Sequence, residues 1–175
     1  MLYKLFLSVF VFFWLSACGF RPLYGESSLE SAKPLESIKI RIIGDREGQL
    51  LRNKLRHSLT PYGQPRHPKY ELNVSLSYTD KGLGIDKDAT TTRNQIILDV
   101  RYYLKDFRSG KVLYQDSLKL VSDFNILKTS YYSNVVSEKS AKEGLLKEAA
   151  ESIKIGIASY MEHKKSSDED RPSTV

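Results

Sequence analysis

Residues 90–106, Thr-Thr-Thr-Arg-Asn-Gln-Ile-Ile-Leu-Asp-Val-Arg-Tyr-Tyr-Leu-Lys-Asp, decide the fold because they predict one long β-strand. Apolar and polar residues alternate in its second half, which is the pattern of a strand with one buried face. The apolar side carries Leu98, Val100, Tyr102 and Leu104. Arg108–Gly110 predicts a turn into a further strand at residues 111–124, so we expect an antiparallel hairpin.

The register of this hairpin stays open, because the strand at 111–124 mixes apolar and polar residues on both faces. One face would carry Val112, Tyr114, Asp116 and Leu118, and the other Leu113, Gln115 and Ser117.

Two more strands are expected before this hairpin. Alternate apolar residues from Tyr70 to Tyr78 predict a strand with one buried face, and Asp80–Gly82 predicts the turn that follows it. Residues 36–43 alternate in the same way, with β-branched side chains on one face, and predict the first strand of the chain.

Two segments have the period of an amphipathic helix. Over residues 46–59 leucines recur every four positions, and Asp45 before them is expected to cap the helix. Over about residues 135–163 an apolar stripe opposes a face of Glu and Lys. The stripe consists of Leu146, Ala149 or Ala150, Ile153, Ile157, Tyr160 and Met161. Before this helix, residues 125–134 predict an aromatic loop containing Tyr131 and Tyr132.

The order of elements is strand, helix, three strands, helix, with short connections between the last three strands. We therefore predict a single α+β domain over residues 36–163, in which two helices pack on one face of a four-stranded, mostly antiparallel sheet. The polar residues 164–175 predict a disordered tail.

The amino end predicts a lipoprotein signal peptide at residues 1–17. Lys4 precedes an apolar run that ends with the small residues Ser16 and Ala17, and Cys18 follows directly. The run is shorter than the roughly 20 apolar residues that a membrane-spanning helix needs. An uncleaved anchor and an ordinary signal peptide remain the alternatives. Lipidation of Cys18 would place the chain in the periplasm, tethered through residues 18–35.

Gly19 stands after Cys18, where aspartate often retains such proteins in the inner membrane, so the outer membrane is favoured. Removal of residues 1–17 takes away Lys4 alone among the charged residues, which leaves a formal net charge of +5 instead of +6. This balance fits phosphate-rich lipid heads or an acidic protein, and a simply solvated surface fits it equally well. Nucleic acid is scarce in the periplasm and is not expected as a partner.

No catalytic or metal-binding pattern is found in the sequence. His57, His67 and His163 are scattered and lack a second ligand at helical spacing, so no metal site is expected. Asp86 and Asp88 beside Lys87 more often form a solvated loop than an acid–base pair. We expect no enzyme activity and no cofactor other than the covalent lipid on Cys18. A periplasmic hydrolase is the alternative, and it would require a catalytic cluster.

Basic and aromatic residues are the better candidates for binding. Arg93, which follows three threonines, and nearby Lys87 could hold phosphorylated lipid heads through charge-assisted hydrogen bonds. An exposed strand end with solubilising charges is the alternative. Rigid, amphipathic tyrosines suit a protein interface, although some must belong to the core. They are Tyr102, Tyr103, Tyr114, Tyr131 and Tyr132.

Three short motifs, in this order, resemble the lipopolysaccharide-assembly lipoprotein family LptE in its alphaproteobacterial form. They are Cys18-Gly19-Phe20-Arg21-Pro22-Leu23-Tyr24-Gly25, Gly48-Gln49-Leu50-Leu51-Arg52-Asn53 and Thr91-Thr92-Arg93. The resemblance covers roughly residues 18–162 and implies two helices against a four-stranded sheet. It also implies a complex with the outer-membrane β-barrel LptD, in which the protein plugs the barrel and assists its assembly and the delivery of lipopolysaccharide to the outer leaflet.

Among the family's functional residues, only Cys18 is carried over to a defined role by this resemblance. Arg93 and Lys87 are therefore expected to contact lipopolysaccharide from their local chemistry alone. An auxiliary or pilot lipoprotein of another outer-membrane or lipid-transport complex is the second interpretation of the same features.

Overall fold

The computed structural model describes residues 35–85, 91–126 and 130–169. The predicted signal peptide, Cys18 and the tether as far as residue 34 lie outside the described residues. Among the residues described, no helix is both long and apolar enough to cross a membrane.

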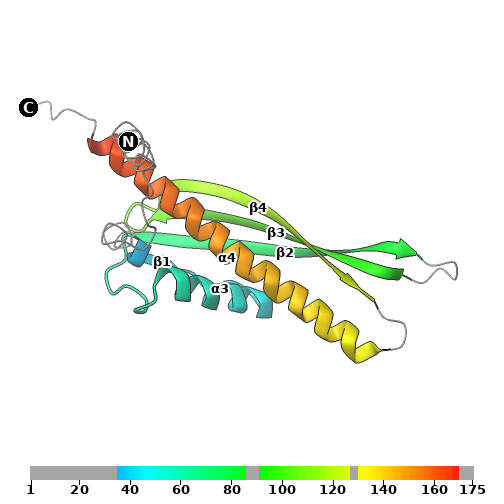
Figure 1. Ribbon diagram of the computed structural model, residues 1–175. Helices are drawn as coiled ribbons and strands as arrows, with labels where there is room; N and C mark the ends of the chain where they lie inside the picture. Colours follow the sequence, from blue (N-terminus) through cyan, green and yellow to red (C-terminus); the bar gives the residue numbers. More distant parts are fainter. Residues whose placement is uncertain (1–34, 86–90, 127–129, 170–175) are drawn as a thin grey trace, which may run out of the picture. The chain divides into compact units, whose positions relative to one another are not determined.

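One four-stranded sheet runs in the order β1 (Ile38–Ile40), β2 (Tyr70–Ile85), β3 (Thr91–Asp106) and β4 (Val112–Asn125) (Figure 1). β1 pairs with β2 in parallel, and the other two pairs are antiparallel. The predicted mostly antiparallel sheet is therefore confirmed. β1 is shorter than the strand predicted at 36–43, whereas β3 differs from its prediction by one residue.

β2 is longer than predicted, and the turn predicted at Asp80–Gly82 is wrong. Asp80 lies opposite Ile96 and Lys81 opposite Gln95, so the segment is an ordinary part of the β2–β3 ladder. Its polar composition resembles a turn, but each of its residues has a partner residue on β3. Register shifts around Gly84 follow, close to the end of the strand.

A β-bulge in β4 makes the expected placement of Val112 and Tyr114 on one face wrong. Leu104 pairs with Tyr114 but Lys105 pairs with Val112, so Leu113 is an extra residue on β4. One extra residue moves the following side chains to the opposite face. Val112 therefore leaves the face of Tyr114 and is 44% exposed.

The first helix, α3 (Asp45–Leu59), agrees with the predicted range, but the predicted cap by Asp45 is wrong. Gly44, in extended conformation, occupies the N-cap and makes no side-chain bond, while Asp45 has a φ of 61° inside the first turn. An N-cap side chain must come from the extended residue before the helix, and that position holds a glycine.

The family-like motif at residues 48–53 has a structural role at the start of α3. Gly48 is buried against Ile43, and the Gln49 side-chain amide donates a hydrogen bond to the Ile43 carbonyl. Leu51 faces the core and is fully buried. These residues hold the loop from β1 against the helix.

The second helix, α4 (Tyr131–Glu169), is longer at both ends than the predicted 135–163. The Ser130 hydroxyl accepts a hydrogen bond from the backbone N–H of Ser133 at 3.3 Å, so the helix starts early and the loop predicted to hold Tyr131 and Tyr132 is wrong. The predicted boundary of the tail at residue 164 is also wrong. Ser167 donates its hydroxyl to the His163 carbonyl at 3.0 Å within a continuing helix. Of the predicted tail, residues 170–175 lie outside the described residues.

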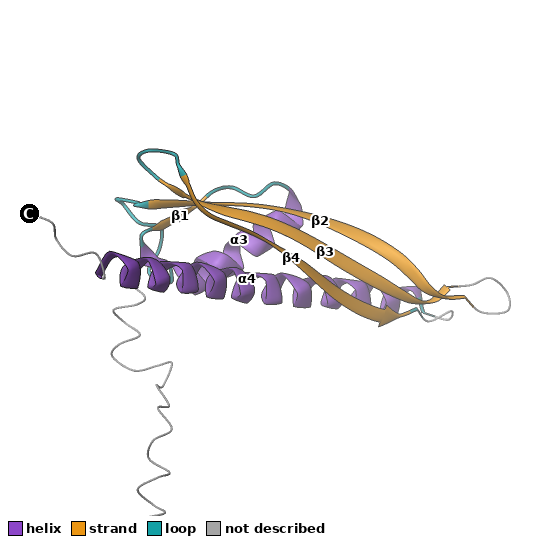
Figure 2. Cartoon of the chain, turned by 90° about the horizontal axis from the view of Figure 1, so that it is seen from above, coloured by secondary structure: helices purple, strands orange, loops and turns teal. Residues whose placement is uncertain are grey.

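Both helices pack on one face of the sheet (Figure 2). The predicted stripes of both helices form the core with alternate residues of β3. The buried cluster contains Leu51, Leu55 and Leu59 from α3, Leu145, Leu146, Ala149, Ala150, Ile153 and Ile157 from α4, and Leu98, Val100, Tyr102 and Leu104 from β3. The opposite face of the sheet is mostly polar, with Ser75, Ser77, Arg101, Ser117 and Lys119 exposed. Ile97, Tyr103 and Val121 are apolar residues on the same face.

Candidate ligand-binding end of the sheet

The end of β2, the start of β3, the end of β4 and the start of α4 lie at the same end of the sheet, which we call the distal end (Figure 1). Of the two residues predicted to bind lipopolysaccharide, the structure places Arg93 here, in β3. Lys87 belongs to residues 86–90, outside the described residues, as do Asp86 and Asp88.

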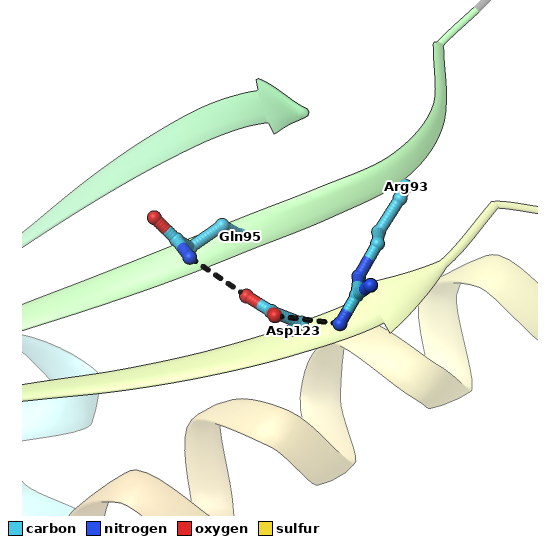
Figure 3. Close-up of polar contacts among 3 residues, drawn as sticks. All are labelled: Arg93, Gln95 and Asp123. Atoms are coloured by element: carbon cyan, nitrogen blue, oxygen red, sulfur yellow. Dashed lines mark hydrogen bonds and ion pairs between the residues drawn. The ribbon is translucent and has the colours of Figure 1, made fainter. Parts of the chain in front are cut away.

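Arg93 is held by a partner that the sequence analysis missed. Its Nη2 donates to Asp123 Oδ2 at 2.8 Å, and Gln95 Nε2 donates to Asp123 Oδ1 at 2.9 Å (Figure 3). Gln95 pairs with Asp123 across β3 and β4, and this register brings the carboxylate within reach of Arg93. Asp123 was missed because the register of the predicted hairpin was left open. The bulge at Leu113 shifts that register by one residue.

The arrangement fits recognition of an anion better than a stabilising role. The Arg93 side chain is 55% exposed, and exposed ion pairs contribute about 0–1 kcal/mol to stability. A guanidinium carries five N–H donors, so a phosphate can bind beside the carboxylate. Asp123 then fixes the direction of the Arg93 side chain.

A cleft of about 670 Å³ lies beside this pair, between the end of β4 and the first turns of α4. β4 contributes residues 121–124, and Ser137 and Ser140 line the α4 side. Asp123 and Glu148 are the acidic residues among those that line it, and they disfavour an anion inside the cleft. Phe124 packs on the core and strand side chains alternate, so the Asp123 side chain and its partner Arg93 lie on the face of the sheet away from α4. We therefore expect the anionic part of any ligand at Arg93, on that face and outside the cleft.

The predicted interface tyrosines divide between the core and the surface. Tyr102 is buried and Tyr114 packs against the core, so these two are structural. Tyr131 is 85% exposed and Tyr132 78% exposed in the first turn of α4. Tyr103 stands on the opposite face of the sheet and is partly exposed. The distal end, where Arg93 lies, therefore also presents the two exposed rings of Tyr131 and Tyr132.

Lys142 on α4 is a basic residue that is already engaged. Its Nζ donates to Glu138 at 2.6 Å, and this bond raises the pKa of Lys142 despite the opposing effect of desolvation. The same ammonium group lies 5.6 Å from the centre of the Tyr78 ring. Lys142 thus joins α4 to β2 instead of facing the cleft.

Within the described ranges, no group of three or more His, Cys, Asp or Glu side chains is placed to hold a metal ion. The charged residues that line the cleft are Asp123 and Glu148, and Asp123 is paired with Arg93. Of these three groups, the Arg93 guanidinium is the one that can donate hydrogen bonds to an anion.

Comparisons with known proteins identify relatives of the chain. A model of the LptE family, described as lipopolysaccharide-assembly, matches residues 35–157. An uncharacterised protein of Rickettsia prowazekii (strain Madrid E) is 31% identical over 146 residues, which cover 83% of this chain and 90% of that protein.

Solved structures share the fold. A protein of Caulobacter crescentus CB15 described as a lipoprotein is 21% identical and has a TM-score of 0.62, with coverage of 82% of this chain and 99% of that chain. The rare lipoprotein B of Shewanella oneidensis is 12% identical and has a TM-score of 0.58, with coverage of 73% and 98%. At these identities the likeness shows the fold alone.

Proposed function

Since the chain belongs to the LptE family of lipopolysaccharide-assembly proteins, we propose that it is an outer-membrane lipoprotein that forms a complex with the LptD β-barrel. In that complex it plugs the barrel and assists both barrel assembly and the insertion of lipopolysaccharide into the outer leaflet. The match of the family model over residues 35–157 carries this proposal, and those residues include α3, all four strands and α4 as far as Ile157. The role is non-enzymatic.

The uncovered face of the sheet supports a plug role. Arg101 lies between Ser75 and Ser117 across three strands, and all three side chains are exposed. The interior of a membrane β-barrel is polar, and small hydroxyl side chains with isolated charges can hydrogen-bond to such a wall. An apolar face of the same size would instead favour association with another hydrophobic surface.

The anchor proposed at Cys18 would confine the search for the barrel to a membrane surface. A single acyl chain binds a membrane only marginally, whereas two or more chains anchor it stably. Once the complex has formed, the protein interface can hold the domain. The lipid is therefore proposed to matter most before assembly.

Co-purification tests the complex. When the chain is isolated from detergent-solubilised outer membranes, we expect a β-barrel protein of far greater mass to accompany it. A Cys18→Ala chain, exported by an ordinary signal peptide, should still capture the barrel when both are abundant. Recovery of the monomer alone, together with normal surface lipopolysaccharide after depletion of the chain, would contradict the proposal.

Lipopolysaccharide contact is proposed at Arg93 and Lys87. Charge-assisted hydrogen bonds contribute about 1.5–3 kcal/mol each, so Lys87→Glu combined with Arg93→Glu should weaken lipopolysaccharide binding by at least about tenfold. The measurement is a binding titration with purified lipopolysaccharide on variants whose circular dichroism is unchanged.

The matched control is Lys119→Glu with Lys147→Glu, which makes the same change in net charge at exposed positions outside this pair. It should bind lipopolysaccharide nearly as well as the unmodified chain. Unchanged binding by the folded Lys87 and Arg93 variant would remove this surface from the proposal.

A further inference from the structure

The end of the sheet opposite the cleft, which we call the proximal end, joins four separate segments of the chain. The Lys69 N–H donates to the Ser37 carbonyl at 3.0 Å, and the Phe107 N–H donates to the Lys69 carbonyl at 2.9 Å. α4 reaches the same place, because Lys164 Nζ lies 5.9 Å from the centre of the Tyr70 ring. Figure 1 shows β1, the β3–β4 turn and the C-terminal part of α4 together here.

Basic residues outnumber acidic ones at the proximal end. The segments 36–41, 69–71, 105–111 and 162–165 carry the basic residues Lys39, Arg41, Lys69, Lys105, Arg108, Lys111, Lys164 and Lys165. Their acidic residues are Glu36, Glu71, Asp106 and Glu162. A local excess of this kind creates a positive potential at one end of the domain.

Two of these carboxylates, Asp106 and Glu71, are already engaged. Asp106 accepts the Ser109 N–H at 2.7 Å, the Ser109 hydroxyl at 2.8 Å and the Arg108 N–H at 3.1 Å, and these bonds lower the pKa of Asp106. Glu71 accepts the Asn73 side-chain amide at 3.1 Å and lies 3.6 Å from Arg41. The side chains of Lys39, Lys69, Arg108, Lys111 and Lys164 are all exposed.

Aromatic rings stand among these cations. Lys39 Nζ lies 5.3 Å from the centre of the Phe107 ring, and Phe107 is 40% exposed. Tyr62, in the loop that leads from α3 to Lys69, is 91% exposed. Basic side chains beside exposed aromatic rings are typical of surfaces that contact the headgroup region of a membrane.

The path of the chain connects this end to the proposed anchor. β1 begins at Ile38, and the chain from Cys18 to Leu35 can extend at most about 60 Å. This step rests on the lipidation proposed at Cys18. The proximal end is thus the first part of the described domain that follows the tether, and the tether is long enough for this end to reach the bilayer.

We propose that the proximal end binds the anionic phospholipid headgroups of the leaflet that holds the Cys18 lipid. The cations and the two aromatic rings form a second contact with the membrane, in addition to the acyl chains. The distal end, with Arg93 and the cleft, then points away from that leaflet. This contact requires no barrel partner.

Vesicle sedimentation tests the proposal with the chain from residue 18 onward carrying Cys18→Ala, which has no lipid of its own. We expect binding to vesicles of phosphatidylglycerol and phosphatidylcholine and none to phosphatidylcholine alone. Each basic residue near an anionic surface contributes a factor of about five, so Lys69→Glu with Arg108→Glu and Lys111→Glu should lower the partition coefficient about 100-fold or more.

Lys81→Glu with Lys119→Glu and Lys147→Glu is the matched control, since these three side chains are exposed elsewhere and the change in charge is equal. It should retain most of the binding. Equal losses in both variants, or no loss in the first, would overturn the proposal. So would binding to lipopolysaccharide micelles without binding to phosphatidylglycerol vesicles. A failure of barrel co-purification leaves this result unaffected, so the two proposals fail separately.

Discussion

Gly156→Ala is expected to lower the free energy of unfolding by about 2 kcal/mol or more. A Cβ at this position of α4 would lie 2.5 Å from the Tyr102 hydroxyl oxygen and 3.2 Å from that of Tyr114. Overpacking of this kind costs about 1–3 kcal/mol. The gain that alanine brings over glycine inside a helix is about 1 kcal/mol, so it offsets only part of the overpacking cost.

The hydroxyl groups cannot move away freely. Tyr102 and Tyr114 both donate to Asp116 Oδ2, at 3.3 Å and 3.2 Å, and Tyr114 also stacks on Tyr160. Burial, and then the neighbouring Tyr114 hydroxyl, raise the pKa of Tyr102, so its hydroxyl stays protonated and donates. Displacement of the buried ring would leave that donor unpaired, at a cost of about 1–3 kcal/mol.

Urea unfolding followed by circular dichroism measures the effect, and the same helix supplies the control. A Cβ at Gly144 meets nothing within 4 Å, so Gly144→Ala should raise stability by up to about 1 kcal/mol. Tyr102→Phe removes the nearest clashing atom and should rescue part of the loss in Gly156→Ala. Equal stability of the two alanine variants would contradict close packing of α4 on the sheet.

Gly48→Ala is expected to destabilise the protein by about 1–2 kcal/mol, although alanine favours a helix. The new Cβ would lie 2.7 Å from Ile43 Cγ2 and 3.1 Å from the Ile43 carbonyl carbon. The second contact is with backbone, which a change of rotamer cannot relieve. Gln49 holds the same backbone through the Ile43 carbonyl, so the loop cannot easily withdraw.

Chemical denaturation of Gly48→Ala and Gly44→Ser makes the comparison. Gly44 is the N-cap of α3, and a Cβ there meets nothing within 4 Å. Serine is a preferred N-cap residue, so Gly44→Ser should preserve or raise stability. A stability gain in Gly48→Ala would show that helix propensity outweighs packing at this position.

The elements with strong local periodicity were predicted well. Alternation over residues 90–106 located β3 to within a residue, and the stripe from Leu146 to Ile157 identified the buried face of α4. In both segments the side chains that become buried repeat at the period of the backbone itself. The fold class follows from these patterns and the short connections between the last three strands.

The ends of the elements could not be predicted from periodicity. Asp80–Gly82 has the composition of a turn, and only the ladder with β3 makes it a strand. From the sequence Tyr131 resembles a loop residue. In the structure the Ser130 hydroxyl accepts a hydrogen bond from the Ser133 N–H, and the helix begins at Tyr131. In each case a hydrogen-bond partner outside the local pattern decided the structure.

The candidate site shows the same division. Arg93 was identified from its type and its polar surroundings, which are properties of the sequence. Its partner Asp123 depends on the register of β3 and β4, which Leu113 shifts by one residue. Because strand side chains alternate with a period of two, such a shift exchanges the faces of the strand.

By itself the sequence determined the fold class, the buried faces of the helices and β3, and the resemblance to LptE. Those features depend on local periodicity and short motifs. Only the tertiary structure decided which charges meet, where the cleft lies and how the basic residues of four segments gather at the proximal end. These features depend on strand register and helix packing, which join residues far apart in the chain and which a single bulge or glycine contact can change.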